Sequence, residues 1–294
     1  MKRDTLVLDD GRRLAWVAFG PAHGRSVLYC HGFPASGAEA AFAESAAHAA
    51  GACVLAPDRP GFGGSDAMPG RHLADWPNDA IALLDALGAE AAPVIGVSGG
   101  GPYALACAAR APARFPRVAT LGALHSLARP GDDDGMALLS RCSVRLARRY
   151  PRAQALLFHL LAGLIRMAPA LLFRLLSAGH GPADRAVFED PLMRARWTTA
   201  LREGVAQGGA AATTELHLYI AETMGVADRV QVPVSVWHGL EDTVVPAAHG
   251  ERIAHALAHA ERHFVPGEGH FSLPVDAIAA VLAWLLDPPA GHGD

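Results

Sequence analysis

Short apolar segments that alternate with segments of helical periodicity restrict the fold of this chain more than any other feature of its sequence. The predicted strands are residues 26–30, 52–56, 93–97 and 118–124, and the predicted helices between them are 38–50, 73–87 and 102–110. Strands that alternate with helices form parallel βαβ units, and all-apolar strands are typical of a sheet covered on both faces. Residues 1–20 instead alternate apolar and polar side chains around Asp9-Asp10-Gly11, which predicts a hairpin.

The alternation stops between residues 129 and 228. This segment contains long Leu- and Ala-rich stretches divided by prolines and no clear strand, so it is predicted to form several helices. Strands are predicted again at 232–237 and 262–265, with helices at 244–258 and 275–286. We therefore expect one α/β core of residues 1–128 and 229–294, with a helical cap of residues 129–228 inserted between the sixth and seventh strands.

The clearest sign of chemistry is the segment Gly96-Val97-Ser98-Gly99-Gly100. It fits the pattern G-x-S-x-G and lies directly between a predicted strand and a predicted helix. A serine on such a strained turn projects its hydroxyl above the sheet, and larger side chains two positions to either side would collide there. This context indicates that Ser98 is a nucleophile, with an ordinary glycine turn as the alternative.

A nucleophilic serine needs a base, and the base needs an acid that orients it. Asp242 follows the predicted strand at 232–237, and His270 lies in the Gly-rich loop after the last predicted strand. Both loops leave the carboxyl ends of strands, at the edge of the sheet where Ser98 lies. We expect Ser98, Asp242 and His270 to act together, with Glu241 as the second choice for the acid.

The negative charge of the transition state needs hydrogen-bond donors. The segment His31-Gly32-Phe33-Pro34 follows the predicted strand at 26–30, and Gly99 follows the serine at the start of a helix. We expect the backbone N–H groups of Phe33 and Gly99 to form an oxyanion hole, helped at Gly99 by the positive end of the helix dipole.

Several other histidines are weaker candidates for the base than His270. His255, His259 and His263 are four residues apart and are expected to share one face of a helix. A solvated face is favoured over a metal site there, because the sequence has no HExxH motif and no matching carboxylates nearby. His31 and His238 precede glycines at strand ends, where structural hydrogen bonds are expected.

Substrate contacts are expected from His125, at the end of a strand, and from apolar residues of the cap. The candidates in the cap are Phe158 and Trp197, and the other aromatic residues considered there are Phe173, Phe188 and Tyr219. Aromatic and aliphatic side chains line most small-molecule sites, with a few polar groups that fix orientation.

These motifs together resemble the α/β-hydrolase fold family, in its branch of cap-bearing serine hydrolases and esterases. The matching segments are His31-Gly32-Phe33-Pro34, Asp58 to Ser65, Gly96 to Pro102, Gly239 to Asp242 with Val245-Pro246, and Gly269-His270. The resemblance implies an eight-stranded, mostly parallel sheet, a triad of Ser98, His270 and Asp242, and no cofactor or metal. It assigns the loop from Asp58 to Ser65 to structure and to the mouth of the pocket, and leaves substrate choice to the cap.

The predicted activity is hydrolysis of a small to medium, largely apolar carboxylic ester or lactone through an acyl-enzyme on Ser98. Carbon–carbon bond hydrolysis of ring-cleavage products uses the same groups and stays open, as does a non-catalytic small-ligand receptor on the same scaffold. A serine nucleophile disfavours the haloalkane dehalogenase and epoxide hydrolase branches. Gly99, at a position where proline peptidases usually carry tryptophan, disfavours that branch.

Composition limits the partners and the location. The chain has 25 Lys and Arg against 29 Asp and Glu, which provides no basic face for nucleic acid. The most hydrophobic stretch, 153–176, is broken by charged residues and proline, so no membrane-spanning helix is expected, and a membrane-surface helix is the alternative. The first 20 residues do not resemble a signal peptide, and the four cysteines form no CxxC pair. We expect a small-molecule substrate, buried free thiols and a cytoplasmic location, with the oligomeric state left open.

Overall fold

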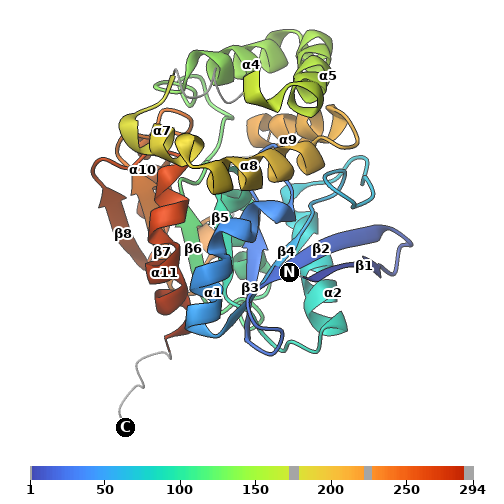
Figure 1. Ribbon diagram of the computed structural model, residues 1–294, viewed down its shortest axis with the longest axis vertical. Helices are drawn as coiled ribbons and strands as arrows, with labels where there is room; N and C mark the ends of the chain where they lie inside the picture. Colours follow the sequence, from blue (N-terminus) through green and yellow to red (C-terminus); the bar gives the residue numbers. More distant parts are fainter. Residues whose placement is uncertain (1, 172–178, 222–226, 288–294) are drawn as a thin grey trace.

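The computed structural model describes residues 2–171, 179–221 and 227–287, and an eight-stranded sheet forms its centre (Figure 1). The strands are β1 (Lys2–Val7), β2 (Arg13–Phe19), β3 (Arg25–Cys30), β4 (Ala52–Pro57), β5 (Val94–Val97), β6 (Val118–Leu121), β7 (Val234–Gly239) and β8 (Ala260–Val265). Their order across the sheet is β1-β2-β4-β3-β5-β6-β7-β8. The pairs β1–β2 and β2–β4 are antiparallel and the others are parallel, so the predicted hairpin and the mostly parallel sheet are confirmed.

The order in which successive parallel strands are added to the sheet reverses at β3, because β4 lies on one side of it and β5 on the other. Leu28 of this strand pairs with Leu55 of β4 on one side and with Val94 of β5 on the other. Where the order of parallel strands reverses, the loops at their carboxyl ends diverge and leave a crevice that commonly holds a ligand. The turn after β3 carries Phe33, and the turn after β5 carries Ser98. The proposed oxyanion donor and the proposed nucleophile therefore both lie where the strand order reverses.

Helices of the core cover both faces of the sheet. One face packs against α1 (Glu44–Ala50) and α11 (Ser272–Leu286), and the other against α2 (Trp76–Ala86), α3 (Gly101–Arg110) and α10 (Ala247–Ala256). Short 3₁₀ helices precede three of them: η1 (Gly37–Ala43), η2 (Leu73–Asp75) and η3 (Ser98–Gly100). The helix predicted at 38–50 is therefore part 3₁₀ and part α-helix.

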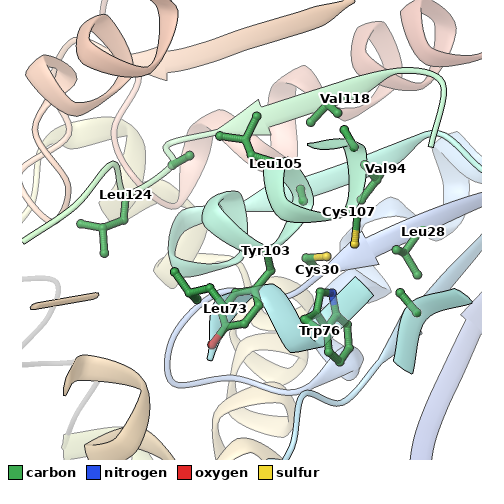
Figure 2. Packing of buried hydrophobic residues seen from close by; sticks show 14 of the residues in the cluster. Leu28, Cys30, Leu73, Trp76, Val94, Tyr103, Leu105, Cys107, Val118 and Leu124 are labelled. Carbon is green, nitrogen blue, oxygen red and sulfur yellow. The ribbon is translucent and has the colours of Figure 1, made fainter. Parts of the chain in front are cut away.

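The core on the α2 and α3 face is mostly aliphatic and also contains the rings of Trp76 and Tyr103 and the thiols of Cys30 and Cys107 (Figure 2). The rings of Trp76 and Tyr103 meet edge to face, with centroids 6.1 Å apart. The sulfur atoms of Cys30 and Cys107 point toward each other between β3 and α3 (Figure 2). All four cysteines are free, but Cys142 is exposed, so the prediction of buried thiols is wrong for this one.

Residues 129–228, called here the helical insertion, contain no strand in their described part. The helices are α4 (Leu138–Arg149), α5 (Pro151–Met167), α7 (Pro182–Glu189), α8 (Pro191–Gly204) and α9 (Ala210–Ala221), and the short η4 (Ala227–Arg229) follows. Three of them begin with a proline, at a position where the missing N–H group has no helical partner. Figure 1 shows α7, α8 and α9 between the sheet and the pair α4–α5. No helix in the described ranges is both long and apolar enough to span a membrane.

Two predicted elements end earlier than their apolar patterns. Strand β6 ends at Leu121, because the chain turns at Gly122 with a φ of 54°. Helix α10 ends at Ala256, because Leu257 adopts an extended conformation. His259 and His263 therefore lie before and within β8, and the prediction that they share a helix face with His255 is wrong. The ring of His263 stacks on Trp237 instead, with centroids 3.9 Å apart.

Candidate active site

Ser98 lies on a strained turn directly after β5. Its φ of 52° is the only left-handed value among the non-glycine residues described. A Cβ atom at Gly96 would lie 2.7 Å from the Cβ of Ala104, and one at Gly100 would lie 2.0 Å from the carbonyl oxygen of Cys30. Real Cβ atoms do not come this close, so the flanking glycines let α3 pack against the sheet while the turn projects Ser98 from its edge.

His270 and Asp242 lie beside this serine. The Nε2 atom of His270 is 3.0 Å from Ser98 Oγ, and its Nδ1 atom is 2.7 Å from Asp242 Oδ2. The other carboxylate oxygen of Asp242 accepts backbone N–H groups of Val244 and Val245 at 2.9 and 2.8 Å, which fixes its orientation. The structure thus brings together the three residues predicted from the sequence.

The alternative acid lies outside this group. Glu241 is exposed, whereas Asp242 is buried and faces the imidazole. Gly122 lies against the pair, since a Cβ atom there would be 3.3 Å from Asp242 Oδ2 and 3.4 Å from His270 Nδ1. Asp242 is therefore the carboxylate that can orient His270.

The charges of the pair support each other. Burial alone would lower the pKa of His270, but the charge and hydrogen bond of Asp242 raise it above its usual value, with smaller contributions from Asp184 and Glu39. Burial would raise the pKa of Asp242, but the His270 imidazolium and then His238 hold it below its usual range. With Asp242 ionised, His270 carries its proton on Nδ1 and presents a free Nε2 lone pair to the serine hydroxyl. This arrangement can transfer a proton from serine to histidine.

Two neighbouring histidines form structural hydrogen bonds, as predicted. His31 Nδ1 donates to the carbonyl of Gly32 at 2.8 Å, and its Nε2 accepts the N–H group of Arg59 at 3.1 Å. Burial and then the Arg59 charge hold the pKa of His31 well below its usual value, so this ring stays neutral. His238 Nε2 donates to the carbonyl of Val245 at 2.7 Å.

The two turns that carry Phe33 and Gly99 touch each other. A Cβ atom at Gly99 would lie 2.8 Å from Phe33 Cβ and 2.5 Å from the hydroxyl of Tyr219. Gly32, just before Phe33, donates its N–H to Glu39 Oε2 at 2.6 Å, and Tyr29 donates its hydroxyl to the same oxygen at 3.0 Å. Burial raises the pKa of Glu39 to about 7.

A buried ion pair joins the helical insertion to these turns. Arg59 Nε donates to Glu215 Oε1 on α9 at 2.7 Å, and neither side chain is exposed. The same guanidinium donates to the carbonyls of His31 and Gly32. The hydroxyl of Tyr219 lies 2.9 Å from Glu215 Oε1 and 2.8 Å from the carbonyl oxygen of Gly99. Arg59 belongs to a motif noted in the sequence, but no local signal marks Glu215, because an acid in a surface helix is usually solvated.

A cavity of about 290 Å³ opens beside Ser98, between the sheet edge and the insertion. Phe158, Trp197 and Tyr219 line it together with Phe33, Gly99 and His270. Most of the remaining lining is aliphatic, and the described lining contains no Lys or Arg. The lining of the cavity is therefore largely apolar, as in most small-molecule sites.

Other predicted contacts lie elsewhere. His125 is not part of the cavity lining, and its N–H donates to His249 Nδ1 at 3.2 Å. Phe188 does not line the cavity and packs against Phe271, which does; Phe173 lies outside the described residues. The loop from Asp58 to Ser65 contributes nothing to the lining; Gln207 of the insertion binds its carbonyls at Gly63 and Ser65. This loop therefore has the expected structural role, since it anchors the insertion, and it does not line the cavity.

Comparison with known proteins agrees with this fold. The family model described as "alpha/beta hydrolase fold" matches residues 25–277. A 2-hydroxymuconate semialdehyde hydrolase from Pseudomonas putida is 27% identical over 236 residues, which cover 74% of this chain and 70% of the relative. A non-heme chloroperoxidase from Streptomyces lividans is 29% identical over 273 residues, covering 90% and 92%.

A solved structure has the same fold. The enol-lactonase from Burkholderia xenovorans superposes with a TM-score of 0.71 at 22% identity, and the match covers 97% of this chain and all of that one. The sheet order, the strained serine turn and a family match over most of the sequence lead to one conclusion. This chain belongs to the α/β-hydrolase fold family and is a hydrolase.

Proposed function

We propose that this enzyme is a serine hydrolase that cleaves a small to medium, largely apolar carboxylic ester or lactone through an acyl-enzyme on Ser98. The observation that carries the proposal is the continuous contact from Asp242 through His270 to Ser98, at distances of 2.7 and 3.0 Å, beside an apolar cavity. An ordinary glycine turn would have no need of a base and an oriented acid next to its serine.

The proposed reaction has two halves. Ser98 Oγ attacks the carbonyl carbon of the ester while His270 Nε2 takes its proton, and backbone N–H groups of Phe33 and Gly99 stabilise the oxyanion. His270 then returns the proton to the leaving alcohol, and the acyl group stays on Ser98. A water molecule attacks this acyl-enzyme, giving its proton to His270, and the acid leaves as Ser98 regains a proton.

The helical insertion acts as the cap that selects substrate in this proposal. Phe158 of α5, Trp197 of α8 and Tyr219 of α9 reach the cavity from three of its helices. Their area and apolar character favour acyl or alkyl groups over charged ones. His125, which does not reach the cavity, has no place in the proposed site.

Carbon–carbon bond hydrolysis of ring-cleavage products is the competing activity, and the Pseudomonas putida relative is named a 2-hydroxymuconate semialdehyde hydrolase. A muconate is a carboxylate, and carboxylates are commonly bound by Arg or Lys. The described lining has neither, and Glu39 adds a carboxyl group to it. This charge pattern favours a neutral ester over an anionic ring-cleavage product.

One experiment separates these activities from a non-catalytic receptor. The protein is treated with a fluorophosphonate probe and the modified residue is located by mass spectrometry; turnover is then measured on p-nitrophenyl esters of increasing acyl length and on a ring-cleavage dienone. We expect labelling at Ser98 and hydrolysis of the esters. Labelling with faster turnover of the dienone would assign carbon–carbon hydrolysis, and no labelling would leave the receptor.

A further inference from the structure

A carboxylate from the helical insertion holds the backbone of the histidine loop. Asp184 of α7 accepts the N–H of His270 on Oδ2 at 3.0 Å, and the N–H groups of Phe271 and Ser272 on Oδ1, both at 2.9 Å. The residue is 1% exposed, although it lies 86 positions before His270 in the sequence. Three convergent N–H groups on one buried carboxylate form a rigid attachment.

The histidine loop is shaped to receive this carboxylate. A Cβ atom at Gly269 would lie 2.4 Å from both Cγ and Oδ2 of Asp184, so the glycine makes room for the contact. The three N–H groups precede or begin α11, where the helix dipole favours a negative charge. Asp184 does not line the cavity, so it cannot touch substrate there.

We propose that Asp184 is a positioning residue, through which the helical insertion places His270 for proton transfer. This inference rests on the proposed serine-hydrolase function. It gives the insertion a second role besides selecting substrate, because the base keeps its position only while α7 is docked. A small displacement of a catalytic group lowers the rate strongly, by as much as about a hundredfold for 1 Å.

The charge of Asp184 acts on His270 together with other groups. Asp242 binds the imidazole directly, and Asp184 and then Glu39 also raise the pKa of His270. His238 Nε2 lies 3.5 Å from Asp242 Oδ2, the oxygen that His270 also contacts. If Asp184 loses its charge while these neighbours stay, the pKa of His270 must fall.

The test compares D184N with D190N. Asp190 is a matched control, because it also accepts a backbone N–H at a helix start of the insertion, that of Met193 at 2.8 Å, but is exposed and makes no contact with His270. We expect D184N to lower kcat by about tenfold to a hundredfold with KM changed less than about threefold. We also expect the acid limb of kcat/KM to move to lower pH. D190N should keep the wild-type kcat and pH profile.

The titration of His270, followed by NMR on its ring, gives a readout that does not depend on turnover. A lower His270 pKa in D184N, with Ser98 still labelled by the fluorophosphonate probe, supports the proposal. Folded D184N with wild-type kcat, acid limb and His270 titration overturns it. If wild-type Ser98 is not labelled at all, the proposed function fails, and the NMR titration still decides the action of Asp184 on His270.

A second variant keeps the proposal testable if D184N does not fold. G269A leaves Asp184 in place but sets a methyl group against its carboxylate, from the side of the core. We expect the same fall in kcat with little change in KM, because the displaced carboxylate no longer holds the three N–H groups of the histidine loop. Wild-type kcat in folded G269A would contradict the proposed role.

Discussion

The hydroxyl of Tyr219 lies 2.8 Å from the carbonyl oxygen of Gly99, the residue that follows the proposed nucleophile. Tyr219 of the insertion thus occupies the space that a side chain at position 99 would need. The Cβ atom of Phe33 would also be too close to such a side chain. The bare glycine at this position is therefore matched to the insertion above it.

This contact predicts coupling between two substitutions. Gly99→Ala places a methyl group 2.5 Å from the Tyr219 hydroxyl, so we expect kcat/KM to fall by about tenfold or more. Tyr219→Phe removes the hydroxyl and should cost about 1 kcal/mol of stability. In the double variant part of the loss from Gly99→Ala should disappear, because one of the two obstacles is gone. Independent, additive effects in the four-member cycle would contradict this account.

The nucleophile is tested by Ser98→Ala. We expect turnover to fall by about a million-fold, because the three residues act as a unit, while thermal unfolding stays close to that of the wild type. Ester hydrolysis and fluorophosphonate labelling are measured side by side. A variant that retained more than a tenth of the activity would remove Ser98 from the mechanism.

The acid is tested by Asp242→Asn against Glu241→Gln. Asp242 binds the imidazole, whereas Glu241 is exposed, so the two isosteric changes differ only in which carboxylate is neutralised. We expect Asp242→Asn to lower kcat by about ten-thousand-fold, because the histidine loses the partner that fixes its tautomer. Glu241→Gln should stay near the wild type. The reverse ranking in steady-state kinetics would assign the acid to Glu241.

The pH profile follows from the charge around His270. The base must be neutral to take the serine proton, so kcat/KM should rise with pH through the pKa of His270 in the free enzyme. Asp242, and then Asp184 and Glu39, raise this pKa, so the midpoint of the acid limb should lie above about 6.5. Below the midpoint the enzyme is protonated on His270 and inactive.

Variants and a chelator serve as controls for that profile. His255→Ala and His259→Ala should leave the limb and the rate unchanged, because neither residue contacts the proposed site. Added EDTA should also have no effect, since no step of the proposed reaction uses a metal. A loss of activity with EDTA that zinc restores would contradict the serine mechanism and indicate a metal-dependent one.

Substrate size is predicted from the cavity wall. Phe158→Ala and Trp197→Ala each remove a large ring from the lining and should move the preferred p-nitrophenyl ester to a longer acyl chain. Phe115→Ala, which removes a buried ring of the core outside the lining, controls for lost packing and should lower stability without moving the preference. The measurement is kcat/KM across the ester series for each variant.

The core and the proposed triad could be predicted because their signals are local. Strand β5 is a short apolar run, and Ser98 follows it within a fixed glycine pattern. Asp242 and His270 were found by their place after strands, since parallel strands bring their carboxyl ends to one edge. The end of α10 was missed because the Ala- and His-rich pattern continues past Leu257 while the backbone becomes extended.

The contacts from the insertion could not be predicted. Asp184 and Glu215 are single acids in helices with many polar residues, and nothing near them in the sequence marks their burial. Their partners, His270 and Arg59, lie 86 and 156 positions away, so only the docked insertion reveals the pairs. The position of His125 outside the cavity lining could not be predicted either, because the direction of a loop after a strand depends on the residues that pack against it.

The buried pair of Arg59 and Glu215 restricts how this enzyme can be recombined with its relatives. Arg59 belongs to the core and Glu215 to the insertion, and removing one partner of a buried pair costs about 3–5 kcal/mol because the other charge is left uncompensated. In a chimera with a foreign insertion that lacks this carboxylate, the buried Arg59 guanidinium would keep only neutral partners, the carbonyls of His31 and Gly32 among them. We therefore expect that a foreign insertion is tolerated by this core only if it supplies a carboxylate at the position of Glu215.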